Sequence, residues 1–235
     1  MVEHREQHHG PCNGTPVGRR TVLGLLGLGA AGVLGGSWLQ NGLVDALGPL
    51  ENHDPTGLLS LIPLGNTFRY YSVTGTVPTK APDSYRLAVS GLVTHAESYS
   101  LAGLAALPQT SFVRDFHCVT GWHVPQVPWR GVRLSTLLDR ARPRTAATAV
   151  RFHSFDGTYT ENMTLRQARR ADVIVALSML GGPVTHDHGG PVRMYSAAMY
   201  GYKSTKWLSG IELTDRVIPG YWENRGYDLN GFIPN

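Results

Sequence analysis

Cysteine and charge are the two properties that this chain has least of. Its 235 residues include two cysteines, Cys12 and Cys118, so a framework of several disulfides is excluded. Only 16% of the residues are charged, and the formal net charge is +4 at pH 7. The basic residues form no stripe and the chain has no internal repeat or low-complexity tract, which excludes the usual signature of a nucleic-acid-binding protein. A small positive surplus of this kind favours anionic ligands instead.

Turn-forming residues are abundant, with 28 glycines and 15 prolines. This composition predicts short strands joined by many turns and few long helices. We expect a single strand-rich α+β domain over residues 65–235. The predicted strands are 68–74, 85–89, 111–116, 149–152, 158–160, 173–177, 191–196 and 207–213. Ser100, Ser135 and Thr164 are the predicted N-caps of short helices that end near residues 107, 141 and 169, and turns are predicted at 129–131 and 156–157.

The N-terminal segment has the pattern of an export signal. Arg19 and Arg20 precede an uncharged apolar run over residues 21–39, which is typical of a twin-arginine signal peptide. We therefore assign residues 1–46 to a signal and residues 47–64 to a linker or arm, and expect a periplasmic or other extracytoplasmic protein. A retained membrane anchor is the alternative, because the run is about long enough to span a bilayer.

Cys118 lies where a predicted strand meets a Gly121–Trp122 turn. Three interpretations of this thiol are open from the residues alone. It is a buried structural cysteine, a nucleophile with His123 as its base, or a metal ligand. His117 is a poor partner, because adjacent strand residues point to opposite faces.

Two further clusters carry groups suited to an anion. Residues 188–193 combine a glycine pair with Arg193, whose guanidinium suits a phosphate. Residues 200–207 contain Lys203 and Lys206 among hydroxyl side chains, although a solvated basic loop explains lysines equally well. A zinc site is disfavoured, because no third histidine or cysteine stands at zinc-like spacing from His186 and His188.

Four ordered blocks resemble the molybdopterin-binding domain of the sulfite oxidase family. They are residues 116–122 with 129–132, residues 188–193, residues 200–207 and residues 220–223. The resemblance spans residues 64–227 and is nearest to the bacterial branch of exported methionine-sulfoxide reductase catalytic subunits.

The resemblance implies a molybdenum ion held by one molybdopterin dithiolene, with Cys118 as the only protein ligand. A thiolate is a soft ligand of the kind that such a metal takes. Trp122 and His123, together with Trp129, would shape the catalytic pocket. The implied cofactor-binding residues are Asn66, Arg69, Tyr70, Ser154, His188, Arg193, Ser204, Thr205 and Lys206.

The activity implied is two-electron oxygen-atom transfer, with a small-molecule or protein-bound S- or N-oxide such as methionine sulfoxide as substrate. Sulfite is the alternative substrate, although Cys118 is followed by Val-Thr-Gly-Trp and not by the arginine-bearing signature of sulfite oxidases. The chain is expected to be a monomer that exchanges electrons with a separate partner, for which the family precedent is a membrane b-type cytochrome. A metal-free Cys118/His123 thiol hydrolase and a non-enzymatic pterin-binding module are the other hypotheses.

Overall fold

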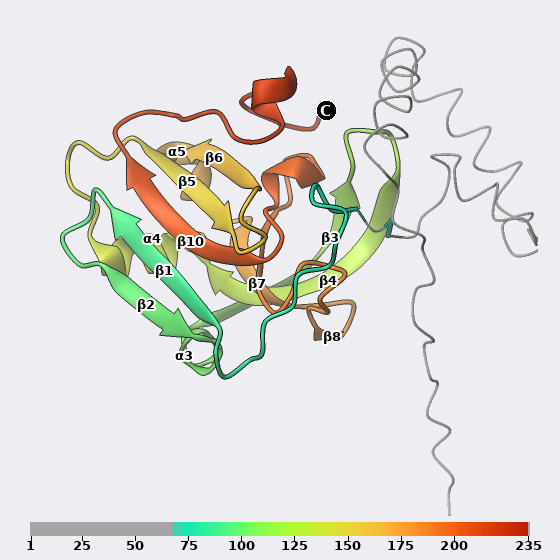
Figure 1. Cartoon of the computed structure of the whole chain (residues 1–235), viewed down its shortest axis with the longest axis horizontal. Coiled ribbons are helices and arrows are strands. Elements are labelled where there is room, and N and C mark those ends of the chain that lie inside the picture. Colours follow the sequence, from blue (N-terminus) through green and yellow to red (C-terminus); the bar gives the residue numbers. More distant parts are fainter. Residues whose placement is uncertain (1–67, 70, 235) are drawn as a thin grey trace, which may run out of the picture.

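The computed structural model describes residues 68–69 and 71–234 (Figure 1). The predicted signal and linker therefore lie outside the described residues. The strands are β1 (Arg86–Gly91), β2 (Glu97–Ser100), β3 (Gln109–His117), β4 (His123–Arg133), β5 (Ala149–Ser154), β6 (Thr160–Thr164), β7 (Val173–Met179), β8 (Gly182–Pro183), β9 (Arg193–Ser196) and β10 (Leu208–Thr214). The helices are α3 (Leu101–Ala105), α4 (Leu134–Ala141), α5 (Leu165–Ala168) and the 3-10 turns η3 (Gly201–Lys203) and η4 (Glu223–Arg225). Strand clearly exceeds helix, which confirms the predicted strand-rich α+β class.

The strands form two five-stranded sheets. The first has the order β2-β1-β10-β5-β6, and the second has the order β3-β4-β7-β8 with β9 paired to β7. β1 and β10 are parallel, whereas the other pairs are antiparallel. Strands far apart in the sequence are thus neighbours, which brings the loops after β3, before β9 and before β10 into one region.

β7 is buried on both faces, as its unbroken apolar run predicted. Val173 and Val175 belong to the main hydrophobic core, whereas Ile174 and Ala176 belong to a second core on the other face. Alternation of this kind follows from the two-residue period of a strand. The second core also contains Phe116, the last apolar side chain before Cys118.

Two of the three predicted helix caps are confirmed. The Ser100 hydroxyl accepts a hydrogen bond from the Gly103 N–H at 3.0 Å, and Thr164 forms a capping box with Gln167. The prediction for Ser135 is wrong. α4 begins at Leu134 with Arg133 in the cap position and no side-chain cap, because β4 runs directly into the helix.

Two other predictions are also wrong. The described residues of 68–74 form no strand. Trp129, Arg130 and Gly131 lie inside β4 and not in a turn. There Trp129 points into the second core and Arg130 points outward, and a Cβ on Gly131 would stand 2.1 Å from the Val175 carbonyl oxygen. This glycine serves a close strand–strand approach.

Within the described residues, no helix has the length and apolar character needed to cross a membrane.

Candidate cofactor site

The thiol of Cys118 is presented by the tight loop that joins β3 to β4. The Cys118 N–H donates to the Trp122 carbonyl at 2.9 Å, and the Gly121 N–H donates to the Cys118 carbonyl at 3.0 Å. Gly121 has a φ of +100°, which favours glycine. The Cys118 sulfur lies 3.1 Å from the Thr120 hydroxyl, so the loop fixes both the backbone and the side chain of the cysteine.

Opposing influences act on the pKa of this thiol. Burial raises the pKa, whereas the hydrogen bonds of Thr120 and the charges of Arg69 and Lys206 lower it. Two cationic side chains therefore lie within electrostatic range of the sulfur. A metal ion bound there would displace the proton and leave a thiolate ligand.

His117 and His123 face one another across the start of the β3–β4 hairpin. Their rings stack with centroids 5.5 Å apart and an angle of 14° between the planes. Burial and His123 lower the pKa of His117. Among the described residues neither ring hydrogen-bonds to Cys118, so the thiol and base contact required of a Cys/His nucleophile is not formed.

Aromatic side chains enclose one side of the Cys118 loop. Trp122 stacks on Phe116 with ring centroids 5.7 Å apart, and Phe68 packs against both. The His188 ring meets the edge of Phe68 at 5.0 Å. This contact connects the first predicted cluster to the second.

Arg193 lies between the two loops that are predicted to bind an anion. It is only 3% exposed, and its guanidinium donates to the carbonyls of His188 at 2.7 Å and Ser204 at 3.3 Å. Burial lowers its pKa to about 10. Arg193 thus ties the two loops together, and its predicted contact with the cofactor phosphate remains a prediction.

The hydroxyl residues of the site differ in what they bind. The Ser154 oxygen accepts from the Asp156 N–H at 3.1 Å, and the Ser204 oxygen accepts from the Ser196 N–H at 3.2 Å. The Thr205 hydroxyl is fully buried and has no hydrogen-bond partner among the described residues. A buried hydroxyl without a partner is costly, so Thr205 is suited to a ligand.

Lys206 follows Thr205 and occupies the centre of the site. Its ammonium donates to the Tyr71 carbonyl and lies 4.4 Å from the centroid of Trp207. Burial and the charge of Arg193 lower its pKa to about 7. A Cβ on Gly189 would stand 2.5 Å from the Lys206 side chain, so this glycine makes room for the lysine.

The N-terminal contacts are the least complete part of the site. Asn66 and Tyr70 lie outside the described residues, whereas the charge of Arg69 lowers the pKa of the Cys118 thiol. Sequence analysis missed Phe68, Tyr71 and Thr120. Only Thr120 carried a signal, since a hydroxyl two residues after a cysteine lies within reach of the sulfur in a tight turn.

The residues present fit a molybdopterin with its metal. In the described part of the chain no three His, Cys, Asp or Glu side chains converge to hold a metal ion, so a metal at Cys118 needs ligands from a cofactor. The half-buried cation of Lys206 and the buried, unpartnered hydroxyl of Thr205 suit its anionic phosphate.

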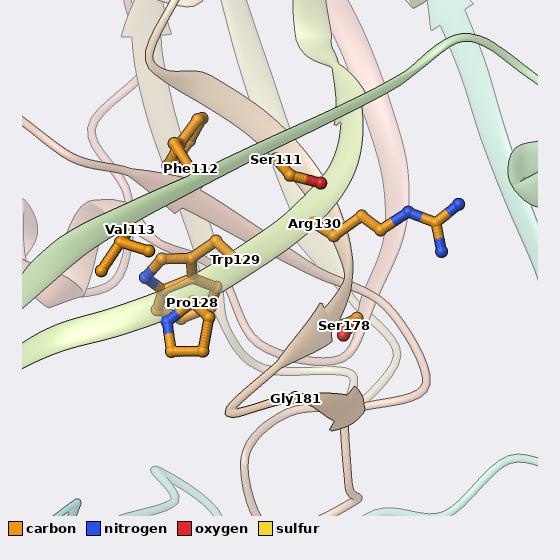
Figure 2. A pocket seen from close by; sticks show the side chains of 8 residues that line it. All are labelled: Ser111, Phe112, Val113, Pro128, Trp129, Arg130, Ser178 and Gly181. Atoms are coloured by element: carbon orange, nitrogen blue, oxygen red, sulfur yellow. The ribbon is translucent and has the colours of Figure 1, made fainter.

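A separate pocket of about 390 Å³ is lined by Trp129 but by none of the other predicted site residues (Figure 2). It lies over β3, β4 and β7, and Trp129, predicted to be beside Cys118, lines it and stacks on Tyr195 at 3.9 Å. Trp129 is therefore one ring away from Trp122, with Phe116 between them. The other residues lining this pocket are Ser111, Phe112, Val113, Pro128, Arg130, Ser178 and Gly181.

Known proteins resemble this chain in sequence. An uncharacterized oxidoreductase of Bacillus subtilis, YuiH, is 35% identical over 159 residues, which are 67% of this chain and 80% of that protein. The putative protein-methionine-sulfoxide reductase subunit YedZ1 of Azospira oryzae is 32% identical over 63% of this chain and 56% of that protein. The protein-methionine-sulfoxide reductase catalytic subunit MsrP of Ralstonia nicotianae is 27% identical over 67% of this chain and 52% of its own length. The chain thus spans about half the length of these two reductase subunits.

The fold also has a solved counterpart. The sulfane dehydrogenase SoxCD of Paracoccus pantotrophus superimposes with a TM-score of 0.56 at 18% identity, over 60% of this chain and 41% of that chain. At this identity the likeness concerns the fold alone. Residues 74–222 match the family described as oxidoreductase molybdopterin binding domain. The chain therefore belongs to this family, which confirms the resemblance to the sulfite oxidase family and makes the protein an oxidoreductase with molybdopterin as its cofactor.

Proposed function

We propose that the protein reduces a sulfoxide, with Cys118 as the only protein ligand of molybdenum. The reaction takes up two electrons and two protons, breaks the sulfur–oxygen bond, and releases a thioether and water. When bound, the molybdopterin supplies the metal centre that accepts the oxygen atom and passes on the electrons. The remaining steps fall to the side chains of this chain.

Each side chain of the site has a task that follows from its position. The Cys118 thiolate holds the metal, and the Thr120 hydroxyl, 3.1 Å away, donates to the sulfur and steadies its charge. Lys206 and the Thr205 hydroxyl bind the anionic part of the cofactor. Arg193 holds together the loops that carry His188 and Ser204 by donating to a backbone carbonyl of each.

The observation that carries the proposal is the thiol of Cys118, fixed in a tight loop within electrostatic range of Lys206 and Arg69. The sulfoxide substrate is supported by the relatives named as methionine-sulfoxide reductase subunits. Sulfite is the weaker alternative, since only Val119, Thr120 and Gly121 separate Cys118 from Trp122 and none of them can bind an anion as an arginine does.

The electron donor and the location form part of the same proposal. Both reductase relatives are named as subunits, which supports a separate partner protein that supplies the electrons. A membrane b-type cytochrome fits this role. Export through the predicted twin-arginine signal of residues 1–46 would place a monomeric enzyme on the side of the membrane where such a partner is accessible.

The test uses full-length protein expressed in a host that makes molybdenum cofactors. We expect stoichiometric molybdenum and pterin, and reduction of methionine sulfoxide with a reduced viologen dye as donor. Reduction of trimethylamine N-oxide and oxidation of sulfite are measured in parallel. Faster turnover of sulfite than of every S- or N-oxide would contradict the proposed substrate, and loaded protein without turnover of either class would contradict the proposed activity.

A further inference from the structure

The pocket over β3, β4 and β7 has exposed apolar side chains around it. Val113, which lines the pocket, is 45% exposed, and Leu180, in the turn between β7 and β8, is 53% exposed. Pro128 lies between them, since it pairs with Val113 in the sheet and its carbonyl accepts from the Leu180 N–H at 3.1 Å. A hollowed surface with neighbouring apolar side chains left open to solvent indicates contact with another molecule.

The rim of this pocket is positively charged. The strand segments around it, residues 109–114, 128–133 and 178–183, contain three exposed arginines and no aspartate or glutamate. Within the part of the chain that the structure describes, none of these arginines forms a salt bridge. One of them, Arg130, lines the pocket and extends away from Trp129 in Figure 2. An apolar centre with this arginine rim fits a partner with an acidic surface.

Trp129 connects the pocket to the interior of the domain. Its side chain is only 1% exposed, and its indole N–H is buried without a hydrogen-bond partner among the described residues. In Figure 2 the indole nitrogen lies on the side of Val113. The N–H of a buried indole usually has an acceptor, so a carbonyl or carboxylate of a bound partner would complete this one.

An aromatic path leads from the pocket to the Cys118 loop. The ring centroids of Trp129 and Phe116 are 6.4 Å apart, and those of Phe116 and Trp122 are 5.7 Å apart. The Trp122 carbonyl then accepts from the Cys118 N–H at 2.9 Å. Because electron tunnelling through a protein slows steeply with distance, three neighbouring rings give electrons a short route from the surface to the proposed metal ligand.

We infer that the electron-donating partner docks on this pocket. The partner is a one-electron carrier protein whose acidic residues pair with the arginine rim and whose apolar side chains cover the pocket. Each encounter oxidises the carrier by one electron, which passes along the aromatic path toward Cys118. Two encounters, with two protons from water, complete the reduction of one sulfoxide to a thioether and water. This inference rests on the proposed function and adds the surface at which electrons enter.

The first test compares two electron donors in the loaded full-length protein. Reduced flavodoxin is an acidic one-electron carrier, whereas a reduced viologen dye is small and needs no docking surface. Arg130→Glu should lower kcat/KM for flavodoxin by about tenfold, because charges at the rim of an interface set the rate of encounter. The value for viologen should stay unchanged. Arg166→Glu, an exposed residue on α5, is the matched control and should leave both values at the wild-type level.

The second test measures binding without turnover. Calorimetric titration of oxidised holoprotein with oxidised flavodoxin should give a Kd that Arg130→Glu and Val113→Asp each weaken severalfold and that Arg166→Glu leaves unchanged. The Kd of wild type should also weaken as the salt concentration rises, because salt screens exposed charges. All three changed side chains are exposed, so the variants should keep the fold, which circular dichroism verifies.

Variants of Trp129 separate docking from electron transfer. Trp129→Phe keeps a ring but removes the indole N–H, so it should weaken the Kd for flavodoxin and retain most of the limiting rate of flavodoxin oxidation. Trp129→Leu also removes the ring and should lower this rate severalfold, with viologen-driven turnover retained. Equal limiting rates in Trp129→Leu and wild type would overturn the aromatic path.

The two levels of the proposal fail in different ways. Viologen-driven sulfoxide reduction by a wild type that flavodoxin does not bind, or whose Kd and kcat/KM Arg130→Glu and Val113→Asp match, would overturn the docking surface and leave the proposed function standing. A dimer in sedimentation that Val113→Asp dissociates would assign the pocket to a second copy of the chain and would also overturn it. Loaded protein without turnover from either donor would overturn both.

Discussion

At the scale of single residues, Lys206 reports most directly on the cofactor. Its pKa of about 7 in the cofactor-free fold lies well below the 10.5 of an ordinary lysine. Between these values the unfolded chain holds a proton that the folded chain has released, so the stability of cofactor-free protein should rise as the pH increases from about 7 toward 10. A bound anion would keep Lys206 protonated and remove this dependence.

Thermal unfolding of cofactor-free protein at several pH values checks the Lys206 prediction. Wild type should gain Tm across this window relative to Lys206→Met, which cannot titrate. Parallel Tm curves for the two proteins would contradict the lowered pKa.

The structure gives Arg193 a role that the sequence did not predict, as a donor to two backbone carbonyls. Arg193→Ala should lower molybdenum occupancy several-fold, because the carbonyls of His188 and Ser204 lose their shared donor and the two loops separate. Arg193→Lys should restore little, since an ammonium cannot span both carbonyls as a guanidinium does. Metal analysis measures the result, with the exposed Arg170→Ala as control, and full occupancy in Arg193→Ala would contradict it.

Part of the site could be predicted from these residues and part could not. A lone cysteine at a strand end, followed by Gly121, was visible in the sequence. The use of Arg193 as a bridge between backbone carbonyls was not, because it depends on which loops β9 and η3 bring together.

At the scale of elements, the β3–β4 hairpin determines where Cys118 lies, and its packing depends on Gly131. Gly131→Ala should destabilise the protein by about 2–4 kcal/mol, because the added methyl would meet the backbone of β7 at 2.1 Å. Gly182→Ala, in β8 with nothing within 4 Å of the added methyl, is the matched control. Urea unfolding compares the two, and equal midpoints would contradict the close approach.

Elements with local signals were predicted better than elements defined by their partners. Ser100 and Thr164 mark helix starts through their own side-chain hydrogen bonds. β2 was missed, because its alternation is short and its strand state depends on pairing with β1. The turn predicted at 129–131 followed the Trp-Arg-Gly composition, whereas pairing with both β3 and β7 holds these residues extended.

At the scale of the whole molecule, a buried ionic cluster ties three distant segments together, because the Lys203 ammonium lies 2.8 Å from Glu161 and 2.5 Å from Glu223. Lys203→Met would leave two carboxylates facing one another without a cation, and should cost about 3–5 kcal/mol of stability. Arg216→Met removes an exposed pair with Asp215 and should cost less than about 1 kcal/mol. Chemical denaturation checks both, and a Lys203→Met protein as stable as Arg216→Met would contradict the account of a buried cluster.

The order of the strands in the two sheets explains why the four sequence blocks shared with the sulfite oxidase family indicated one site. Four sequence blocks separated by up to about half the chain converge because β7 pairs with both β4 and β9 and because β10 lies between β1 and β5. Fold class followed from composition and alternation. The sheet order and the convergence of the loops did not, since long-range pairing leaves no local trace.

The central claim is that Cys118 is the protein ligand of the metal. X-ray absorption at the molybdenum edge measures this directly in oxidised holoprotein, with Cys118→Ser as the comparison and circular dichroism to verify its fold. The account predicts that the variant stays folded and that whatever metal it retains has one sulfur neighbour fewer than in wild type. The same number of sulfur neighbours in both proteins would contradict it.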